Sequence, residues 1–178
     1  MVCLNIARDE CSNEMAIAQR TGHLVDENLG GIGAALAYLV AGIHLFHPQY
    51  GFSRFVGLLT TGNLSLLRYD PRPLAFVLSA FAILLGIKLV LLDFGRKPVY
   101  ALGMVLVGTY FVGYFAWHLT GHGGFLPGRA PLYHGMHPAE AVVSHLANYP
   151  LAAAAKFAEA ALVGVLAVLY RREARTPP

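Results

Sequence analysis

Apolar residues in this chain gather in four long blocks that polar segments separate. The blocks cover residues 29–47, 73–94, 98–119 and 150–170. Each has about the 20 residues that an α-helix needs to cross the hydrocarbon core of a bilayer. Three of them open at a proline, which the first turn of a helix tolerates. The pattern predicts an all-α, polytopic membrane protein, a four-transmembrane-helix bundle that occupies residues 29–170.

The segments between the blocks predict three connections of different kinds. Residues 95–97, GRK, make a tight antiparallel hairpin between the second and third spans. The connection before the second span contains GFSRFVGLLTTGNLSLL, which is too short and too interrupted to cross a membrane. We expect an interfacial helix there, then a turn at residues 60–63 and a return. In the connection before the fourth span, an amphipathic interfacial helix is predicted from Pro138 to Asn148.

Composition supports a membrane protein, and the basic residues predict its orientation. Apolar residues make up 56% of the chain and charged residues 13%, against averages of about 45–50% and about 25%. Arg96 and Lys97 lie in the short hairpin, and three further arginines follow the last span. Because basic residues accumulate on the cytoplasmic side, we expect a multi-pass protein of the cell membrane with both termini cytoplasmic. The arginines at positions 54, 68 and 72, in the first outer connection, oppose this assignment mildly.

Two polar tails flank the predicted bundle. Residues 1–28 are expected to form a cytoplasmic, disordered tail, and residues 171–178 a basic cytoplasmic tail. The first tail lacks the apolar core of a signal peptide. Met1 and Met15 stay open as alternative starts.

Histidines concentrate on one side of the predicted membrane. All of the eight except His23 lie in the outer connections or at the outer ends of spans. Neutral imidazoles bind zinc, copper and haem iron. A haem or other cofactor would use His44 and His118 with Tyr114, and a metal ion would take its ligands from His44, His118, His122 and His145. The alternative is a set of solvated loop histidines.

Two ionisable residues lie deep in the fourth span. Lys156 and Glu159 have i, i+3 spacing, which places them on one face of a helix, and charges at this depth usually face the bundle interior. We expect a polar pocket lined by these two residues with His44, Tyr114 and His118. The alternative is an ion pair that only links helices.

Small residues predict which helix faces pack closely. Such stripes are Gly33, Ala37 and Ala41, which His44 continues, and Ala154, Ala158 and Ala161.

Three stretches carry a family resemblance: AGIHL ends the first block, AFVLSAFAILLGIKLVLLDFGRKPVYALG crosses the hairpin, and GYFAWHL ends the third block. Together they resemble small four-helix integral membrane proteins of unknown function from halophilic archaea, over about Gly30 to Tyr170. The resemblance implies a polytopic membrane protein and no particular activity.

Several function classes are disfavoured, and two stay open. HGMHPAE lacks the HExxH order of a zinc protease, and neither a nucleotide-binding fingerprint nor a basic run for nucleic acid is present. The first hypothesis is a non-enzymatic accessory or structural membrane component, in contact with the lipid bilayer and with a membrane-complex partner or a second copy of itself. The second is a histidine-rich membrane protein that binds a metal or haem for redox chemistry or metal handling at the outer face.

Overall fold

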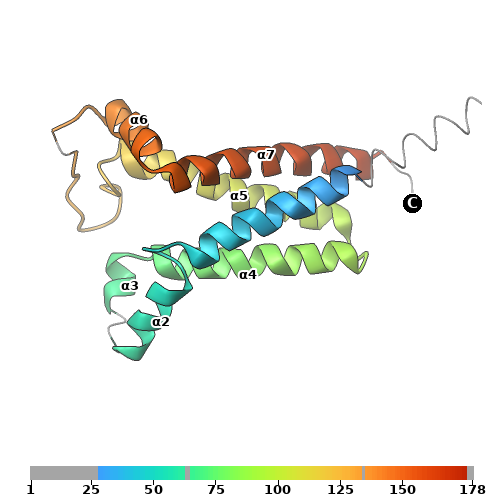
Figure 1. Ribbon diagram of the computed structural model, residues 1–178, viewed down its shortest axis with the longest axis horizontal. Coiled ribbons are helices and arrows are strands. Elements are labelled where there is room, and N and C mark those ends of the chain that lie inside the picture. Colours follow the sequence, from blue (N-terminus) through green and yellow to red (C-terminus); the bar gives the residue numbers. More distant parts are fainter. Residues whose placement is uncertain (1–27, 63–64, 134, 176–178) are drawn as a thin grey trace, which may run out of the picture.

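Seven helices make up the regular structure of the computed structural model, which describes residues 28–62, 65–133 and 135–175 (Figure 1). Four are long, namely the first helix, Asn28–Phe46, then α4 (Arg72–Leu91), α5 (Arg96–Leu119) and α7 (Pro150–Glu173). Three are short, namely α2 (Phe52–Thr60), α3 (Ser65–Tyr69) and α6 (Pro138–Asn148). No β-strand occurs within these ranges, so the described chain is all-helical as predicted.

The four long helices are long and apolar enough to cross a membrane. Their bounds lie within three residues of the predicted spans. The largest differences are at the end of α4, which stops at Leu91, and at the end of α7, which continues to Glu173. The basic side chains after Tyr170 therefore extend the last helix rather than ending it. The short helix α6 begins at Pro138 and ends at Asn148, as the sequence predicts.

The two ends of the bundle differ in what they carry. Figure 1 shows the start of the first helix, the α4–α5 turn and the end of α7 at one end, which we call the hairpin end. The short helices α2, α3 and α6 lie at the opposite end, which we call the loop end. The connections that contain the histidines are thus brought together at the loop end, although they are far apart in the sequence.

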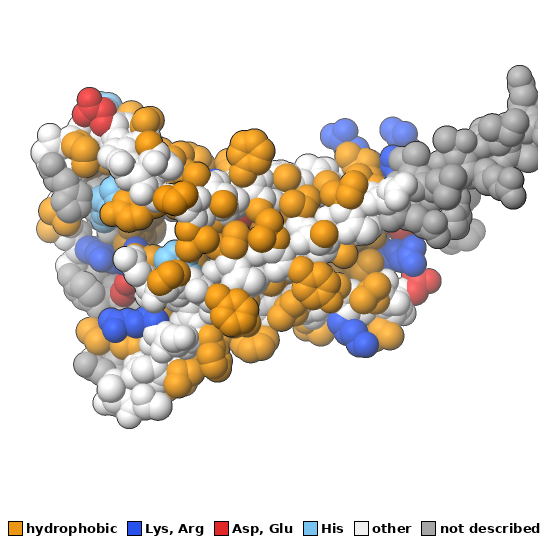
Figure 2. Space-filling model, viewed as in Figure 1, with side chains coloured by type: hydrophobic (Ala, Val, Ile, Leu, Met, Phe, Trp, Pro, Cys, Tyr) orange, Lys and Arg blue, Asp and Glu red, His pale blue; other side chains and the backbone are white. Residues whose placement is uncertain are grey.

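Small and branched apolar side chains form the core between the long helices. Ala37, Val40 and Ala41 of the first helix pack with buried residues of the other three, namely Ala80, Ile83, Ile87, Val107, Ala158 and Leu162. The predicted stripe of Gly33, Ala37, Ala41 and His44 is confirmed, because all four residues are buried. Outside this core, apolar side chains cover the long helices, and charged side chains gather at the two ends (Figure 2).

The predicted small-residue stripe on the last span is wrong for two of its three members. Ala154 and Ala161 are exposed, and only Ala158 is buried. The buried face of α7 instead follows Ala155, Glu159 and Leu162. The buried face differs from the predicted one because Glu159 is directed into the bundle, where its carboxylate contacts His44 and Lys156. Side-chain size alone does not indicate these polar contacts.

Candidate metal centre and buried polar network

His118 lies one residue before the end of α5 and is anchored to its own helix. Its Nδ1 atom lies 2.8 Å from the carbonyl oxygen of Tyr114, one turn earlier. A carbonyl oxygen can only accept, so Nδ1 carries the proton and donates it. The side chain is 8% exposed. The imidazole is therefore held in one tautomer, with Nε2 directed away from α5.

His122 lies in the tight turn that follows α5. It has a φ of 57°, between Gly121 at 68° and Gly123 at 88°. Glycine adopts the left-handed region without strain, and histidine adopts it more readily than most other side chains. A Cβ on Gly123 would lie 2.5 Å from the ring of Trp117. The sequence HLTGHGG thus lets the chain fold back onto Trp117 and aim His122 toward α6.

His122 and His145 are anchored in the same way as His118. Nδ1 of His122 lies 2.9 Å from the carbonyl oxygen of Leu132. Nδ1 of His145, on α6, lies 2.8 Å from the carbonyl oxygen of Ala141, one turn earlier. Each of these Nδ1 atoms therefore donates to a backbone carbonyl, which is the arrangement that orients metal-binding histidines in proteins.

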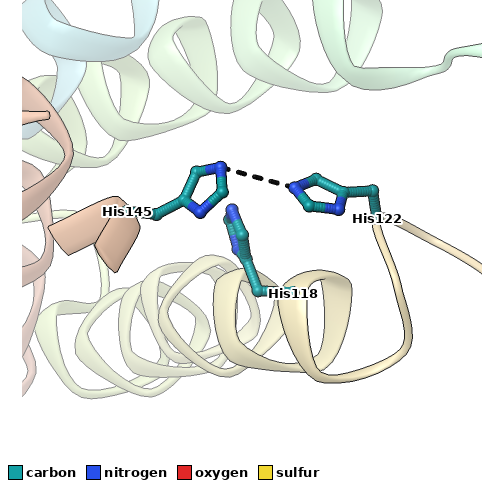
Figure 3. Close-up of side chains that lie close together, drawn as sticks. All are labelled: His118, His122 and His145. Carbon is teal, nitrogen blue, oxygen red and sulfur yellow. Dashed lines mark hydrogen bonds between the residues drawn. The ribbon is translucent and has the colours of Figure 1, made fainter. Parts of the chain in front are cut away.

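The three rings converge on one point at the loop end, and we call them the three-histidine cluster (Figure 3). One ligand nitrogen from each of His118, His122 and His145 lies within 4.8 Å of the others. The Nε2 atoms of His122 and His145 are 3.4 Å apart. Two nitrogens bound tetrahedrally to one zinc ion at about 2.0–2.1 Å would be about 3.3–3.4 Å apart. This pair already has the spacing of two ligands on one ion.

The electrostatics of the cluster favour a cation between the rings. With each Nδ1 proton donated to a carbonyl, neutral rings would present Nε2 lone pairs toward one another. Such an arrangement is repulsive unless a proton or a metal ion lies between the nitrogens. Three imidazoles also suit zinc or copper, so the donor set fits a first-row transition metal.

His44 does not belong to this cluster, contrary to its predicted pairing with His118. Its Nδ1 atom lies 2.8 Å from Oγ of Ser79, and its Nε2 atom lies 3.3 Å from a carboxylate oxygen of Glu159. Both ring nitrogens are therefore used inside the bundle, and neither is left for a haem iron or a shared metal. The two histidines have similar depth in the sequence pattern, but their helices direct them to different partners.

Lys156 and Glu159 form an ion pair within the bundle. Glu159 is 1% exposed and Lys156 12% exposed. The ammonium group of Lys156 also donates to the carbonyl oxygen of Tyr110 at 3.2 Å. With His44 and Ser79 these residues make up what we call the buried polar network, which links the first helix, α4, α5 and α7.

Tyr114 lies between the two groups of polar residues. Its ring centroid is 4.3 Å from that of His118, and the ammonium nitrogen of Lys156 lies 5.1 Å from the Tyr114 ring. A continuous series of contacts thus runs from His44 through Glu159, Lys156 and Tyr114 to His118. The residues of the predicted pocket are brought into this series, although they do not converge on one ligand.

The remaining histidines have local roles or lie outside the described residues. Nδ1 of His47 accepts from the backbone N–H groups of Gln49 and Tyr50. Nδ1 of His137 accepts from the N–H of Ala139 at the start of α6. His23 and His134 lie outside the described residues. Of the four predicted metal ligands, the structure therefore brings together three.

Sequence reasoning missed the arginine that braces the loop end. The Arg72 guanidinium lies 4.1 Å from the ring centroid of Tyr50 and 4.2 Å from that of Trp117. It also forms two 2.7 Å hydrogen bonds with the carboxylate of Asp70. The only signal in the sequence was the presence of three arginines, at positions 54, 68 and 72, in the first outer connection. Their contacts with other loops could not be predicted from the sequence.

The chain matches no family model, no curated protein and no solved structure. The resemblance to halophilic archaeal membrane proteins stays a prediction.

Proposed function

We propose that this chain is an integral membrane protein that binds one transition-metal ion, zinc in the first place, at His118, His122 and His145. In this proposal the four long helices span the cell membrane, with both termini in the cytoplasm and the metal centre at the outer face. Helices α2 and α6 then lie in the outer membrane interface. The surrounding lipid covers the exposed apolar side chains of the long helices.

One observation carries the proposal: three imidazoles converge while each donates its Nδ1 proton to a backbone carbonyl. The acceptors are the carbonyls of Tyr114, Leu132 and Ala141. Solvated loop histidines have no reason to share a tautomer and face one another. Anchoring of this kind fixes the ring orientation before a metal arrives. The side-chain entropy of the three histidines is therefore lost on folding and not on metal binding.

The donor set favours zinc or copper over haem. Imidazole nitrogen suits both ions, and the 3.4 Å separation of two Nε2 atoms fits a tetrahedral zinc site. A bis-histidine haem would need two imidazoles on opposite faces of a porphyrin. His44, the predicted second ligand, uses both of its ring nitrogens within the bundle.

Three protein ligands leave one position of a tetrahedral ion for a water or an exchangeable ligand. Structural zinc sites usually have four protein ligands, whereas sites that activate water or exchange ligands have three. We therefore assign the centre to metal handling or metal-dependent chemistry at the outer face, not to structural support alone.

Elemental analysis of the purified protein tests this assignment. The full chain, purified in detergent without a histidine tag and dialysed against zinc of defined concentration, should retain about one zinc ion per chain. The variants His118→Ala, His122→Ala and His145→Ala should each lose most of this metal, since losing one ligand of three leaves a weak two-ligand site.

The control is His137→Asn, which removes a histidine of the same loop and keeps a residue that can cap α6. It should retain zinc in full. Cobalt bound in place of zinc gives a visible spectrum that reports tetrahedral coordination, and this spectrum should be altered by changes at the three ligands only. Zinc contents equal in the ligand variants and the unaltered chain would exclude the three-histidine centre.

A further inference from the structure

A second polar site lies at the loop end, in a pocket between α2, α3 and the start of α4. The pocket has a volume of about 530 Å³, within the range of about 300–1,000 Å³ that small-molecule sites occupy. Its charged lining residues are Arg54 on α2, Asp70 before α4, and Arg129 in the connection between α5 and α6, which we call the histidine loop. None of these three residues belongs to the metal centre.

The charges on this pocket do not cancel. Asp70 is matched by Arg72, which binds both of its carboxylate oxygens at 2.7 Å. Burial raises the pKa of Asp70, but the hydrogen bonds and charge of Arg72, with a smaller contribution from the charge of Arg129, outweigh it and hold that pKa below its usual value. The Asp70 carboxylate is therefore ionised and already paired. Arg54 and Arg129 contribute two further positive charges to the lining, which favours an anionic ligand.

The two guanidinium groups come from different connections, and one of them is held in position. The Arg129 guanidinium lies 4.7 Å from the ring centroid of Trp117, the residue before metal-site His118. A phosphate group offers more acceptor oxygens than a carboxylate, so two arginines can each bind it in a bidentate manner. Two arginines on one pocket therefore favour phosphate.

The remaining walls of the pocket are largely apolar. They include Leu58 of α2, which is buried, Leu66 of α3, which is 39% exposed, and Pro73 at the start of α4. A lining that combines two arginines with apolar side chains, next to the start of the apolar helix α4, matches a ligand with an anionic head and an apolar tail.

We propose that this pocket binds a phosphate group, carried in the first place by an anionic phospholipid of the membrane leaflet at the loop end. The inference is independent of the metal centre, since it uses different residues. Free phosphate has the same chemistry at the head, and the experiment below separates the two sources.

The test measures which lipid the full chain retains. The protein is reconstituted into vesicles of equal phosphatidylglycerol and phosphatidylcholine, extracted mildly, and its bound lipid is quantified by native mass spectrometry. We expect phosphatidylglycerol to be enriched on the unaltered chain. Replacing both arginines, Arg54→Gln with Arg129→Gln, should reduce that enrichment about tenfold or more, because charge-assisted hydrogen bonds are lost.

Two further variants separate a built pocket from general charge attraction. Arg171→Gln removes an exposed positive charge at the hairpin end and should leave the enrichment unchanged. Leu66→Trp fills the pocket without changing its charge and should reduce the enrichment as strongly as the arginine double variant. Enrichment that persists in Leu66→Trp, or that falls equally in Arg171→Gln, would overturn the proposal.

A second measurement identifies the source of the phosphate and does not depend on extraction. The Tm of the unaltered chain is measured in purely zwitterionic nanodiscs as inorganic phosphate is added. The Tm in the same sulfate-free buffer without phosphate is the reference. A rise in Tm that the arginine double variant lacks supports a site for free phosphate. No rise, together with phosphatidylglycerol enrichment, supports the lipid headgroup. If neither phosphate nor phosphatidylglycerol distinguishes the unaltered chain from the double variant, the pocket does not bind phosphate.

Discussion

His118 and His145 are oriented by the same local device, a hydrogen bond from Nδ1 to the carbonyl oxygen one turn earlier in the helix. Each of these carbonyl oxygens lies within its helix and has a second lone pair, which accepts the imidazole N–H. His122 has no helix of its own and uses the Leu132 carbonyl across the turn instead. At the residue scale, the backbone therefore sets the tautomer of all three rings and leaves Nε2 as the common ligand atom.

The buried polar network depends on single residues in the same way. Glu159 accepts from Lys156 and contacts Nε2 of His44 at 3.3 Å, while Lys156 also reaches the Tyr110 carbonyl. Removing one member of a buried pair leaves the other charge without compensation, which usually costs more than removing both.

We therefore predict that Lys156→Met lowers the free energy of unfolding by about 3 kcal/mol. The double change Lys156→Met with Glu159→Gln should lower it less, since it leaves no unpaired carboxylate. Thermal or denaturant unfolding in detergent measures the difference. Lys88→Met, at an exposed lysine of α4, serves as the control and should have little effect. Losses that simply add in the double variant would show that Lys156 and Glu159 are not coupled.

At the scale of elements, α5 contributes to both the core and the three-histidine cluster. It packs along α7 and also contacts α4 and α6. Close approach to α7 relies on a small residue, because a Cβ at Gly103 would lie 3.1 Å from Cδ1 of Leu166. His118 lies near the end of α5, and His145 lies on α6, which leads directly into α7. The contact between α5 and α7 therefore also helps to fix the positions of these two histidines relative to each other.

Gly103→Leu should separate α5 from α7 and lower the free energy of unfolding by about 1–3 kcal/mol, the usual effect of overpacking. Gly108→Leu in the same helix is the matched control, because a Cβ there meets nothing within 4 Å. Unfolding of the two variants in one detergent gives the comparison. Equal stability of the two leucine variants would mean that Gly103 is not needed for close packing.

At the scale of the whole molecule, an even number of long helices places the start of the first helix and the end of α7 at the hairpin end. The hairpin end carries Arg96, which pairs with Asp93 at 2.8 Å and with Glu173 at 3.8 Å. The loop end carries the three-histidine cluster and the arginine-lined pocket. The two ends are therefore chemically distinct.

Cysteine labelling in intact cells tests the proposed orientation. In a background with Cys3→Ser and Cys11→Ser, Ala130→Cys in the histidine loop should react with a membrane-impermeant maleimide, because that loop is expected outside. Ala174→Cys, an equally exposed alanine after α7, should react only after the cells are permeabilised. Labelling of Ala174→Cys alone in intact cells would invert the topology.

The long helices and the helix from Pro138 to Asn148 follow from the sequence by itself, because block length, helix-starting prolines and hydrophobic spacing are local properties. Local spacing also singled out Lys156 with Glu159, as well as His118, His122 and His145 among the candidate metal ligands. It could not separate His44 from them, since rings at similar depth on different helices are equivalent in a one-dimensional pattern. Only the tertiary structure decided that His44 faces Ser79 and Glu159, because helix rotation and packing set which side chains meet.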